Sequence, residues 1–220
     1  MKINKFSRFD TPLALLNGLA IIACLYIVFM LVPNERLMGA VQRIFYFHVG
    51  SAIACYFAFG IVLICSLGYL ATRKSSFDAF SHAACEVGFL FCSITLVTGM
   101  IWGHSAWNTW FRWEPRLVTF LLLWFIFFGI NALRKFGDPS KIAAHVAVLS
   151  ILGVANVPLV VYSVKFLPQS AQLHPVVVEN GGLRDPMFKV GMFAGMCALI
   201  YLQFILVWLR ARIELLHRKI

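Results

Sequence analysis

The segment Trp102–Leu117, WGHSAWNTWFRWEPRL, gathers aromatic and charged side chains that could together hold a ligand. It contains four of the six tryptophans of the chain, namely Trp102, Trp107, Trp110 and Trp113. The last three recur every third residue, which on a helix would place them along one side, although short turns are the alternative conformation. A belt of interfacial tryptophans would be spread over many helix ends. The concentration in one segment therefore favours a binding role.

Charged side chains accompany these tryptophans. Arg112 and Arg116 lie four positions apart, so on a helix they would present two guanidinium groups, suited to carboxylates, on one face. Histidines on the same side of the molecule could ligate a metal through neutral imidazole. Haem is a flat apolar ring system with two carboxylates and an iron that takes axial ligands. The residue types of this segment therefore indicate a haem site.

The rest of the chain predicts membrane helices. Hydrophobic residues make up 61% of the sequence, against about 45–50% in soluble domains. Six apolar runs are long enough to cross roughly 30 Å of hydrocarbon as helices. They are Leu13–Val32, Ile44–Ala71, Phe80–Trp102, Leu117–Leu133, Ile142–Val164 and Phe188–Leu209. We therefore expect an all-α, polytopic membrane helix bundle with a single domain over residues 1–220.

Arginine and lysine in the connecting segments predict the orientation. These residues are more numerous on the side that contains the N-terminus, so we expect the N-terminus and, after six spans, the C-terminus to be cytoplasmic. The tryptophan-rich segment then lies in the outer loop between the third and fourth spans. The net charge of +10 follows from this asymmetry and indicates a lipid bilayer, with no nucleic-acid partner.

This topology sorts the histidines into two groups. The outer group is His48, His104 and His174. The inner group is His82, His145 and His217. About 30 Å of bilayer separates the groups, so they cannot serve one site, and the tryptophans belong with the outer group.

Two polar positions inside the spans have mainly structural interpretations. Glu86 lies four residues after His82, at a spacing that lets the two side chains satisfy each other; a proton or substrate path is the alternative. Pro158 follows Asn156 in the fifth span and is expected to kink it.

Three stretches resemble the haem-handling proteins of cytochrome c maturation. TGMIWGHSAWNTWFRWEPRL resembles their tryptophan-rich WWD signature, most closely that of the short six-span CcmC type and next that of the larger CcsA type. RIFYFHVG resembles the Arg–x4–His stretch that opens the second span. NVPLVVYSVKFLPQSAQLHP resembles the run at the fifth span and the following loop.

The resemblance implies roles for individual residues. His48 and His174 match the two outer histidines that are held to be axial haem ligands. The four tryptophans of the signature match haem-facing tryptophans. Arg43 and Arg116 match arginines near the haem propionates. Glu114 replaces the usual aspartate of the signature and is expected either to bind the ligand or to contact a haem chaperone.

The chain departs from the family pattern at three further positions. Asn108 stands where a glycine is usual, Phe111 stands where tryptophan is frequent, and Gly50 replaces a usual proline after His48. These departures bear on the subfamily and on the partner more than on haem binding.

The resemblance also implies a carrier and no enzyme. Haem b would bind noncovalently, since the chain contains no Cys-x-x-Cys-His sequence, at the periplasmic side of the bacterial inner membrane. A periplasmic haem chaperone would then receive it. The implied partners include ABC-type transporter subunits and a small single-span subunit.

Two other functions are compatible with the residues. A bis-histidine b-type cytochrome could carry electrons across the membrane, with His82 and His145 offering a second haem site. A scaffold or quinone-binding subunit would bind no haem. Haem content of variants at His48 and His174 separates these classes.

Overall fold

The computed structural model describes residues 10–138, 141–166, 168 and 183–218. Within these residues the regular structure is helical, and six helical stretches are long and apolar enough to cross a membrane. They are Asp10–Leu31, Ala40–Thr72, Ser75–Trp107, Pro115–Phe136, Ile142–Lys165 and Pro186–His217. The predicted all-α bundle of six spans is therefore confirmed.

The spans are built from seven α-helices and three short segments of other helix types. The α-helices are α1 (Asp10–Tyr26), α2 (Ile44–Thr72), α3 (Ser75–Trp107), α4 (Pro115–Phe136), α5 (Ile142–Val154), α6 (Asn156–Tyr162) and α7 (Pro186–His217). The short segments are η1 (Ile27–Leu31), η2 (Ala40–Arg43) and η3 (Ser163–Lys165).

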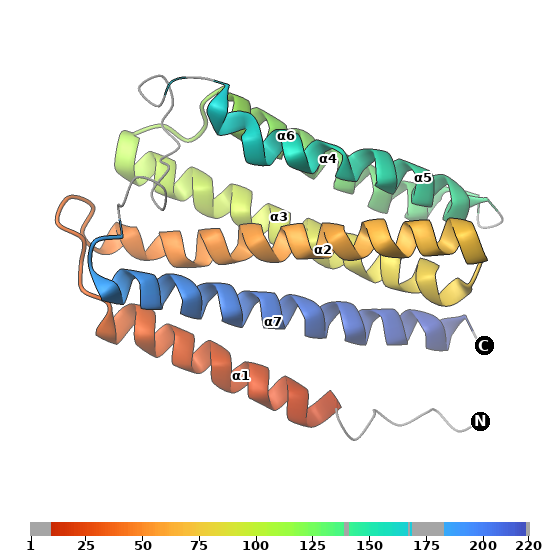
Figure 1. The fold of residues 1–220 in the computed structure, drawn as a ribbon, viewed down its shortest axis with the longest axis horizontal. Helices are drawn as coiled ribbons and strands as arrows, with labels where there is room; N and C mark the ends of the chain where they lie inside the picture. Colours follow the sequence, from red (N-terminus) through yellow and green to blue (C-terminus); the bar gives the residue numbers. More distant parts are fainter. Residues whose placement is uncertain (1–9, 139–140, 167, 169–182, 219–220) are drawn as a thin grey trace.

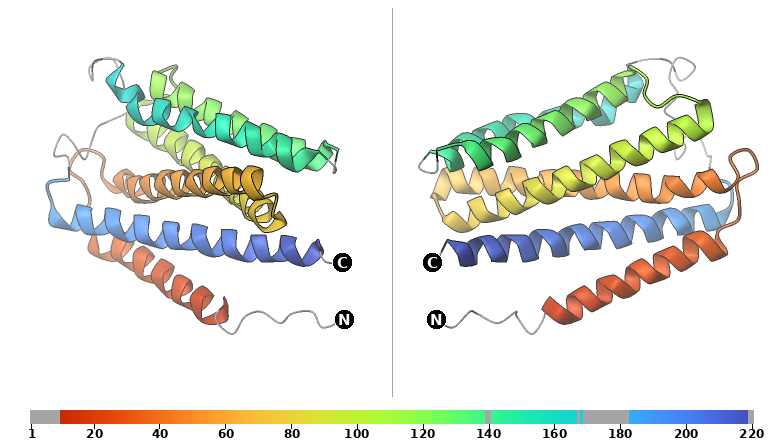
Figure 2. Two further views of the ribbon diagram at one scale, coloured as in Figure 1. Left: turned by 45° about the vertical axis from the view of Figure 1, so that its right-hand side comes forward. Right: turned by 180° about the vertical axis from the view of Figure 1, so that it is seen from behind.

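Successive spans run in alternating directions, with α2 and α3 in the middle of the bundle (Figure 1). α7 and then α1 lie on one side of this pair, and α4, α5 and α6 lie on the other, as the two further views also show (Figure 2). The end of α3 and the start of α4 therefore meet the start of α2 at one end of the molecule. We call this end the tryptophan end.

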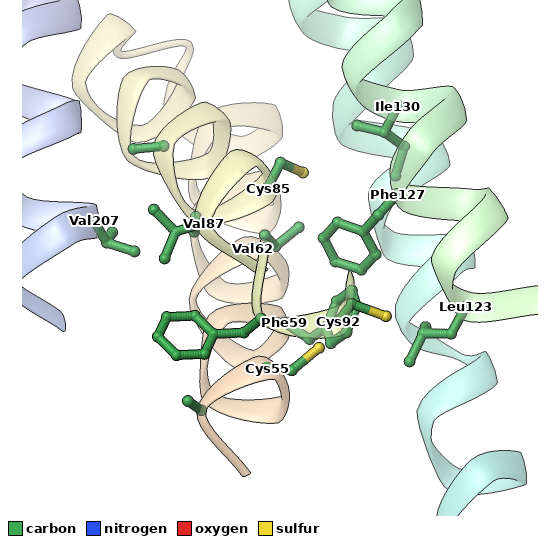
Figure 3. Packing of buried hydrophobic residues seen from close by; sticks show 14 of the residues in the cluster. Cys55, Phe59, Val62, Cys85, Val87, Cys92, Leu123, Phe127, Ile130 and Val207 are labelled. Carbon is green, nitrogen blue, oxygen red and sulfur yellow. The ribbon is translucent and has the colours of Figure 1, made fainter. Parts of the chain in front are cut away.

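The core lies where α2, α3 and α4 pack together. Phe59, Cys92 and Phe127 are almost fully buried there (Figure 3). On the other side, α2 and α7 approach closely through small residues, because a Cβ atom on Gly195 would lie only 2.6 Å from the backbone oxygen of Tyr46. Small residues at such crossings let membrane helices pack backbone to backbone.

The fifth span is interrupted as predicted. α5 ends at Val154 and α6 begins at Asn156, two residues before Pro158. The proline lacks a backbone N–H and its ring clashes with the carbonyl one turn back, so a regular helix is interrupted there. The Asn156 side-chain amide donates a hydrogen bond to the Thr119 carbonyl of α4 at 2.9 Å. The break therefore attaches α6 to the first turns of α4, close to the tryptophan end.

Ion pairs join α3, α4 and α7 at the opposite end of the bundle. The predicted contact of His82 with Glu86 is present, with Nε2 and Oε1 3.4 Å apart. Glu86 also binds Arg210 of α7 at 2.6 Å, a partner that the sequence spacing could not reveal. His82 and His104, both on α3, are about 33 Å apart at 1.5 Å rise per residue, so this network is remote from the tryptophan end.

Candidate functional site

The tryptophan-rich segment is divided between a helix and a loop. α3 continues through Trp102 to Trp107, and Asn108 then adopts a left-handed conformation with φ 52° and ψ 36°. Its backbone N–H donates to the His104 carbonyl at 2.9 Å, which ends the helix. Trp107, Trp110 and Trp113 therefore do not share a helix face, and short turns are the correct alternative.

Asn108 explains how this chain makes the turn without the usual glycine. Only glycine adopts the left-handed conformation without cost, and asparagine is the best tolerated of the other residues. The loop then runs from Asn108 to Glu114, and α4 starts with Pro115 at its first position, where the missing N–H of proline costs no hydrogen bond.

A pocket lies between this loop and the starts of the neighbouring spans. It contains about 840 Å³ of space free of protein atoms, its open mouth included. Residues of four elements line it: His48, Ala52 and Tyr56 of α2; Thr95, Leu96, Gly99, Met100, Trp102, Gly103 and Trp107 of α3; Thr109, Trp110, Phe111 and Arg112 of the loop; and Arg116, Leu117 and Phe120 of α4.

His48 is the imidazole of this pocket. It lies one turn into α2, and its Nδ1 is 3.1 Å from the hydroxyl oxygen of Thr98. Its ring meets Trp102 at an interplanar angle of 65°, with centroids 6.0 Å apart. His48 is therefore held on two sides by α3 while it faces the pocket.

Two helical tryptophans form one wall of the pocket. The Trp102 and Trp107 rings are 6.0 Å apart at an angle of 41°. Trp102 is buried, and its indole N–H finds no hydrogen-bond partner among the residues that the structure describes. Buried polar groups are nearly always paired, so the unpaired indole N–H of Trp102 is an exception that lies beside the pocket.

Trp110 reaches the pocket from the loop and is supported by His104. The two rings stack with centroids 4.1 Å apart and an angle of 5°. Sequence reasoning gave His104 no role beyond that of a surface residue, since a spacing of six residues across a helix end does not predict a ring contact. The structure makes it the support of a pocket tryptophan.

Both arginines of the segment line the pocket. Arg112 comes from the loop and Arg116 from the first turn of α4, so the two do not share the expected helix face, although both line one pocket. Glu114 is buried beside them, with one carboxylate oxygen 3.6 Å from Arg112 Nε. Glu114 does not line the pocket itself, but its carboxylate holds the side chain of Arg112.

Two residues expected at the site lie elsewhere. Arg43 donates from Nε to the Val28 carbonyl at 3.1 Å and from Nη2 to the Val32 carbonyl at 3.4 Å. It thus satisfies carbonyls at the end of the first span. Trp113 is 80% exposed and packs edge-to-face on Phe111. His174 falls outside the described residues.

The polar side chains of the pocket suit a metal that is already coordinated by an organic molecule. No group of three or more His, Cys, Asp or Glu side chains within the described residues could hold a bare metal ion. A metalloporphyrin needs only one or two axial ligands from the protein. One imidazole, three tryptophans and two guanidinium groups around an otherwise apolar pocket fit such a molecule.

The whole chain matches a known protein family. The family model described as heme exporter protein C matches residues 2–220.

Individual relatives agree. A heme exporter protein C of Bradyrhizobium diazoefficiens is 33% identical over 192 residues, which cover 86% of this chain and 73% of the relative. One of Paracoccus denitrificans is 30% identical over 195 residues, covering 86% and 80%. One of Escherichia coli K12 is 32% identical over 135 residues, covering 61% and 55%.

Proposed function

Because this chain belongs to the heme exporter protein C family, we propose that it binds haem b in the pocket beside His48 and delivers it for cytochrome c maturation. Haem is the transported ligand in this proposal. No bond within haem is made or broken, so the chain acts as a carrier and not as an enzyme.

The observation that best supports this function is the convergence of six side chains from separate elements on one pocket. They are His48, Trp102, Trp107, Trp110, Arg112 and Arg116. The apolar rings exclude water from a flat ligand, and the two guanidinium groups bind carboxylates in bidentate fashion.

Each group has a separate task. His48 offers an imidazole nitrogen to the iron. Trp102, Trp107 and Trp110 pack against the ring system. Arg112 and Arg116 bind the two propionates, with Glu114 holding Arg112 in place. Arg43 and Trp113 act outside the pocket. Arg43 donates hydrogen bonds to carbonyls at the end of the first span.

Binding is noncovalent, as a carrier requires. All six cysteines are free, all lie in described parts of the chain, and none lines the pocket. Thioether bonds to the haem vinyl groups are therefore out of reach. Release then requires only the loss of axial ligands and of ion pairs.

His174 is the proposed second axial ligand. It follows the fifth span in the sequence, in the connection that leads to α7. A ligand on a connecting segment can leave the iron without moving a membrane helix, and this suits a protein that must give up its haem to an acceptor.

The orientation predicted from the arginine and lysine distribution supports the proposed setting. The chain is a multi-pass protein of the bacterial inner membrane, with the tryptophan end at the periplasmic side and both termini in the cytoplasm. A periplasmic haem chaperone receives the haem. ABC-type transporter subunits and a small single-span subunit complete the assembly.

An electron-carrying cytochrome is disfavoured by the opposite end of the bundle. His82 is engaged by two carboxylates, with Nε2 3.4 Å from Glu86 and Nδ1 3.6 Å from Glu214. His145 is exposed on the side of α5. A second pocket is lined by His82, Glu86 and Arg134, but among the described residues no tryptophan and no second histidine line it.

Haem content of purified protein tests the proposal. The protein is produced in a host without other maturation genes and quantified as pyridine haemochrome, with the His48→Ala and His174→Ala variants and with His145→Ala as the matched control. We expect about one haem per chain in the wild type and the control, and a large loss in the other two variants.

Two outcomes contradict the proposal. Full haem content in both His48→Ala and His174→Ala would exclude the pocket as a haem site. Two haems per chain, halved in a His82→Ala/His145→Ala double variant, would instead identify an electron carrier.

A further inference from the structure

Thr98 contacts one of the two ring nitrogens of His48, the candidate axial ligand. Thr98 lies on α3 and His48 on α2, and the Thr98 hydroxyl oxygen is 3.1 Å from His48 Nδ1. Thr98 does not itself line the pocket. Thr98 therefore contacts His48 and would affect haem only through this histidine.

The hydrogen bonds of Thr98 decide which atom donates. A hydroxyl has one proton to donate and can accept through its lone pairs. The Thr98 hydroxyl donates to the Ile94 carbonyl, one turn back on α3, at 2.7 Å, and the Thr95 carbonyl lies 3.2 Å from the same oxygen. Since this proton is engaged by the helix backbone, the Thr98 oxygen accepts a hydrogen bond from His48 Nδ1–H.

The proton on Nδ1 fixes the chemistry of the other ring nitrogen. A neutral imidazole carries one N–H, so a protonated Nδ1 leaves a lone pair on Nε2. The hydrogen bond also makes Nε2 a stronger donor to a metal, as second partners of metal-bound histidines generally do.

The surface of α3 also fits the imidazole ring itself. A Cβ atom on Gly99 would lie 3.0 Å from His48 Cε1, closer than most such contacts, so the absence of a side chain there gives the ring its place. Trp102, three residues further along α3, meets the same ring edge-to-face. The ring is thus positioned by consecutive features of one helix.

We infer that Thr98 is a positioning residue that keeps His48 in the tautomer whose Nε2 lone pair is available to haem iron. This inference rests on the proposed function. Thr98 acts through His48 and touches neither the haem nor its acceptor.

Titration of the purified, haem-free protein with ferric haem tests this role. Thr98→Val keeps the shape of the side chain and removes the hydroxyl, and should weaken haem binding about tenfold, as loss of such partners does. Thr98→Ser should restore the affinity. The midpoint potential of the Thr98→Val complex should rise, because a weaker donor stabilises ferric iron less.

Thr119→Val is the matched control. The Thr119 hydroxyl also donates to a carbonyl one turn back on its helix, that of Pro115 at 2.7 Å, and within the described part of the chain it forms no hydrogen bond with a histidine. Its removal should leave haem affinity and potential unchanged. Wild-type affinity and potential in Thr98→Val would overturn the inference.

A double-variant cycle separates positioning from general disturbance of α3. In a His48→Ala background, Thr98→Val should have no further effect. The same tenfold loss in that background would show that Thr98 does not act through His48. If His48→Ala itself binds haem as tightly as the wild type, the proposed function fails at its ligand, an outcome distinct from failure of Thr98 alone.

Discussion

In the proposed function, His48, the pocket tryptophans and the two arginines would bind different parts of a haem molecule. His48 would bind the iron, the indole rings would pack on the porphyrin faces, and Arg112 and Arg116 would bind the carboxylates. The Arg112 guanidinium lies partly in solvent, because its side chain is 52% exposed, and it is held by a buried Glu114. Solvent screening reduces what an exposed charge contributes.

The arginine pair should discriminate between haem and its ester. In an Arg112→Gln/Arg116→Gln double variant we expect haem affinity to fall about tenfold, or about 1.4 kcal/mol, because hydrogen bonds to charged groups contribute about 1.5–3 kcal/mol each when well buried. Haem dimethyl ester has no carboxylates, so its affinity should be unchanged. Both are measured by absorbance titration.

Arg36→Gln is the control for the loss of positive charge. Arg36 is exposed near the same end of the bundle and does not line the pocket, and its removal should not alter the affinity for haem. An equal loss for haem and for the ester in the double variant would contradict the role given to the pair.

Among the elements, the end of α3 determines the shape of the pocket. Trp102 and Trp107 lie on α3 itself. The turn at Asn108 reverses the chain, so that Trp110 and Arg112 of the loop also line the pocket. The turn depends on one residue with positive φ. Its side chain is exposed, so its importance lies in the backbone.

Substitution of Asn108 should show this dependence. Asn108→Gly should retain haem binding and stability, because glycine adopts positive φ freely. Asn108→Val should cost about 1–2 kcal/mol and weaken haem binding, because the loop would leave its position. Thermal unfolding and haem titration measure the two effects.

Arg73→Val provides the comparison. Arg73 ends α2 with φ 57° at the opposite end of the bundle, so this variant should lose similar stability and keep its haem affinity. Equal losses of haem affinity at both positions would mean that binding follows global stability and not the loop.

The extents of the helices show what the sequence could and could not predict. Apolar runs located all six spans, since the cost of unpaired backbone groups in lipid forces each run to be a helix. They ended the third span at Trp102, five residues too early, because polar residues such as His104 can continue a helix beyond the hydrocarbon. The break at Asn156 was predictable from Pro158.

The site was predictable as a set of residue types but not as a geometry. The resemblance grouped His48, four tryptophans and Arg116, and the pocket contains all of them except Trp113. It also included Arg43, which binds carbonyls of the first span instead, because hydrogen bonds to a neighbouring span leave no trace in local sequence. The contacts of Thr98 and of His104 likewise depend on helix packing.

On the scale of the whole molecule, one end of the bundle contains the candidate binding pocket and the other contains ion pairs that hold the spans together. Among the described residues, an ion pair at the tryptophan end joins Arg112 to Glu114, whereas a network of ion pairs joins the spans at the opposite end. There Asp78 binds Arg134 at 2.8 Å and Arg218 at 2.7 Å, and Asp78 and Arg134 are nearly buried. The network joins the third and fourth spans to the end of the sixth.

Removing the charge of Asp78 should separate stability from binding. Asp78→Asn leaves a buried arginine without its partner, and we expect a loss of about 3 kcal/mol in stability. Haem affinity should be unchanged, since Asp78 lies about 26 Å along α3 from Thr95, the nearest pocket residue of that helix. Thermal unfolding and haem titration provide the two readouts.

Asp185→Asn is a matched control for the same substitution. Asp185 caps the start of α7 by accepting from the Met187 N–H at 2.7 Å, and asparagine caps about equally well, so little change is expected. A Asp78→Asn variant as stable as Asp185→Asn would show that the network does not stabilise the bundle.

The central claim is that haem binds in the pocket between α2, α3 and α4, and an experimental structure of the haem-loaded protein tests it most directly. The account predicts iron coordinated by His48 Nε2, a porphyrin flanked by Trp102, Trp107 and Trp110, and propionates at Arg112 and Arg116. Haem density away from His48, or beside His82 at the opposite end, would contradict it.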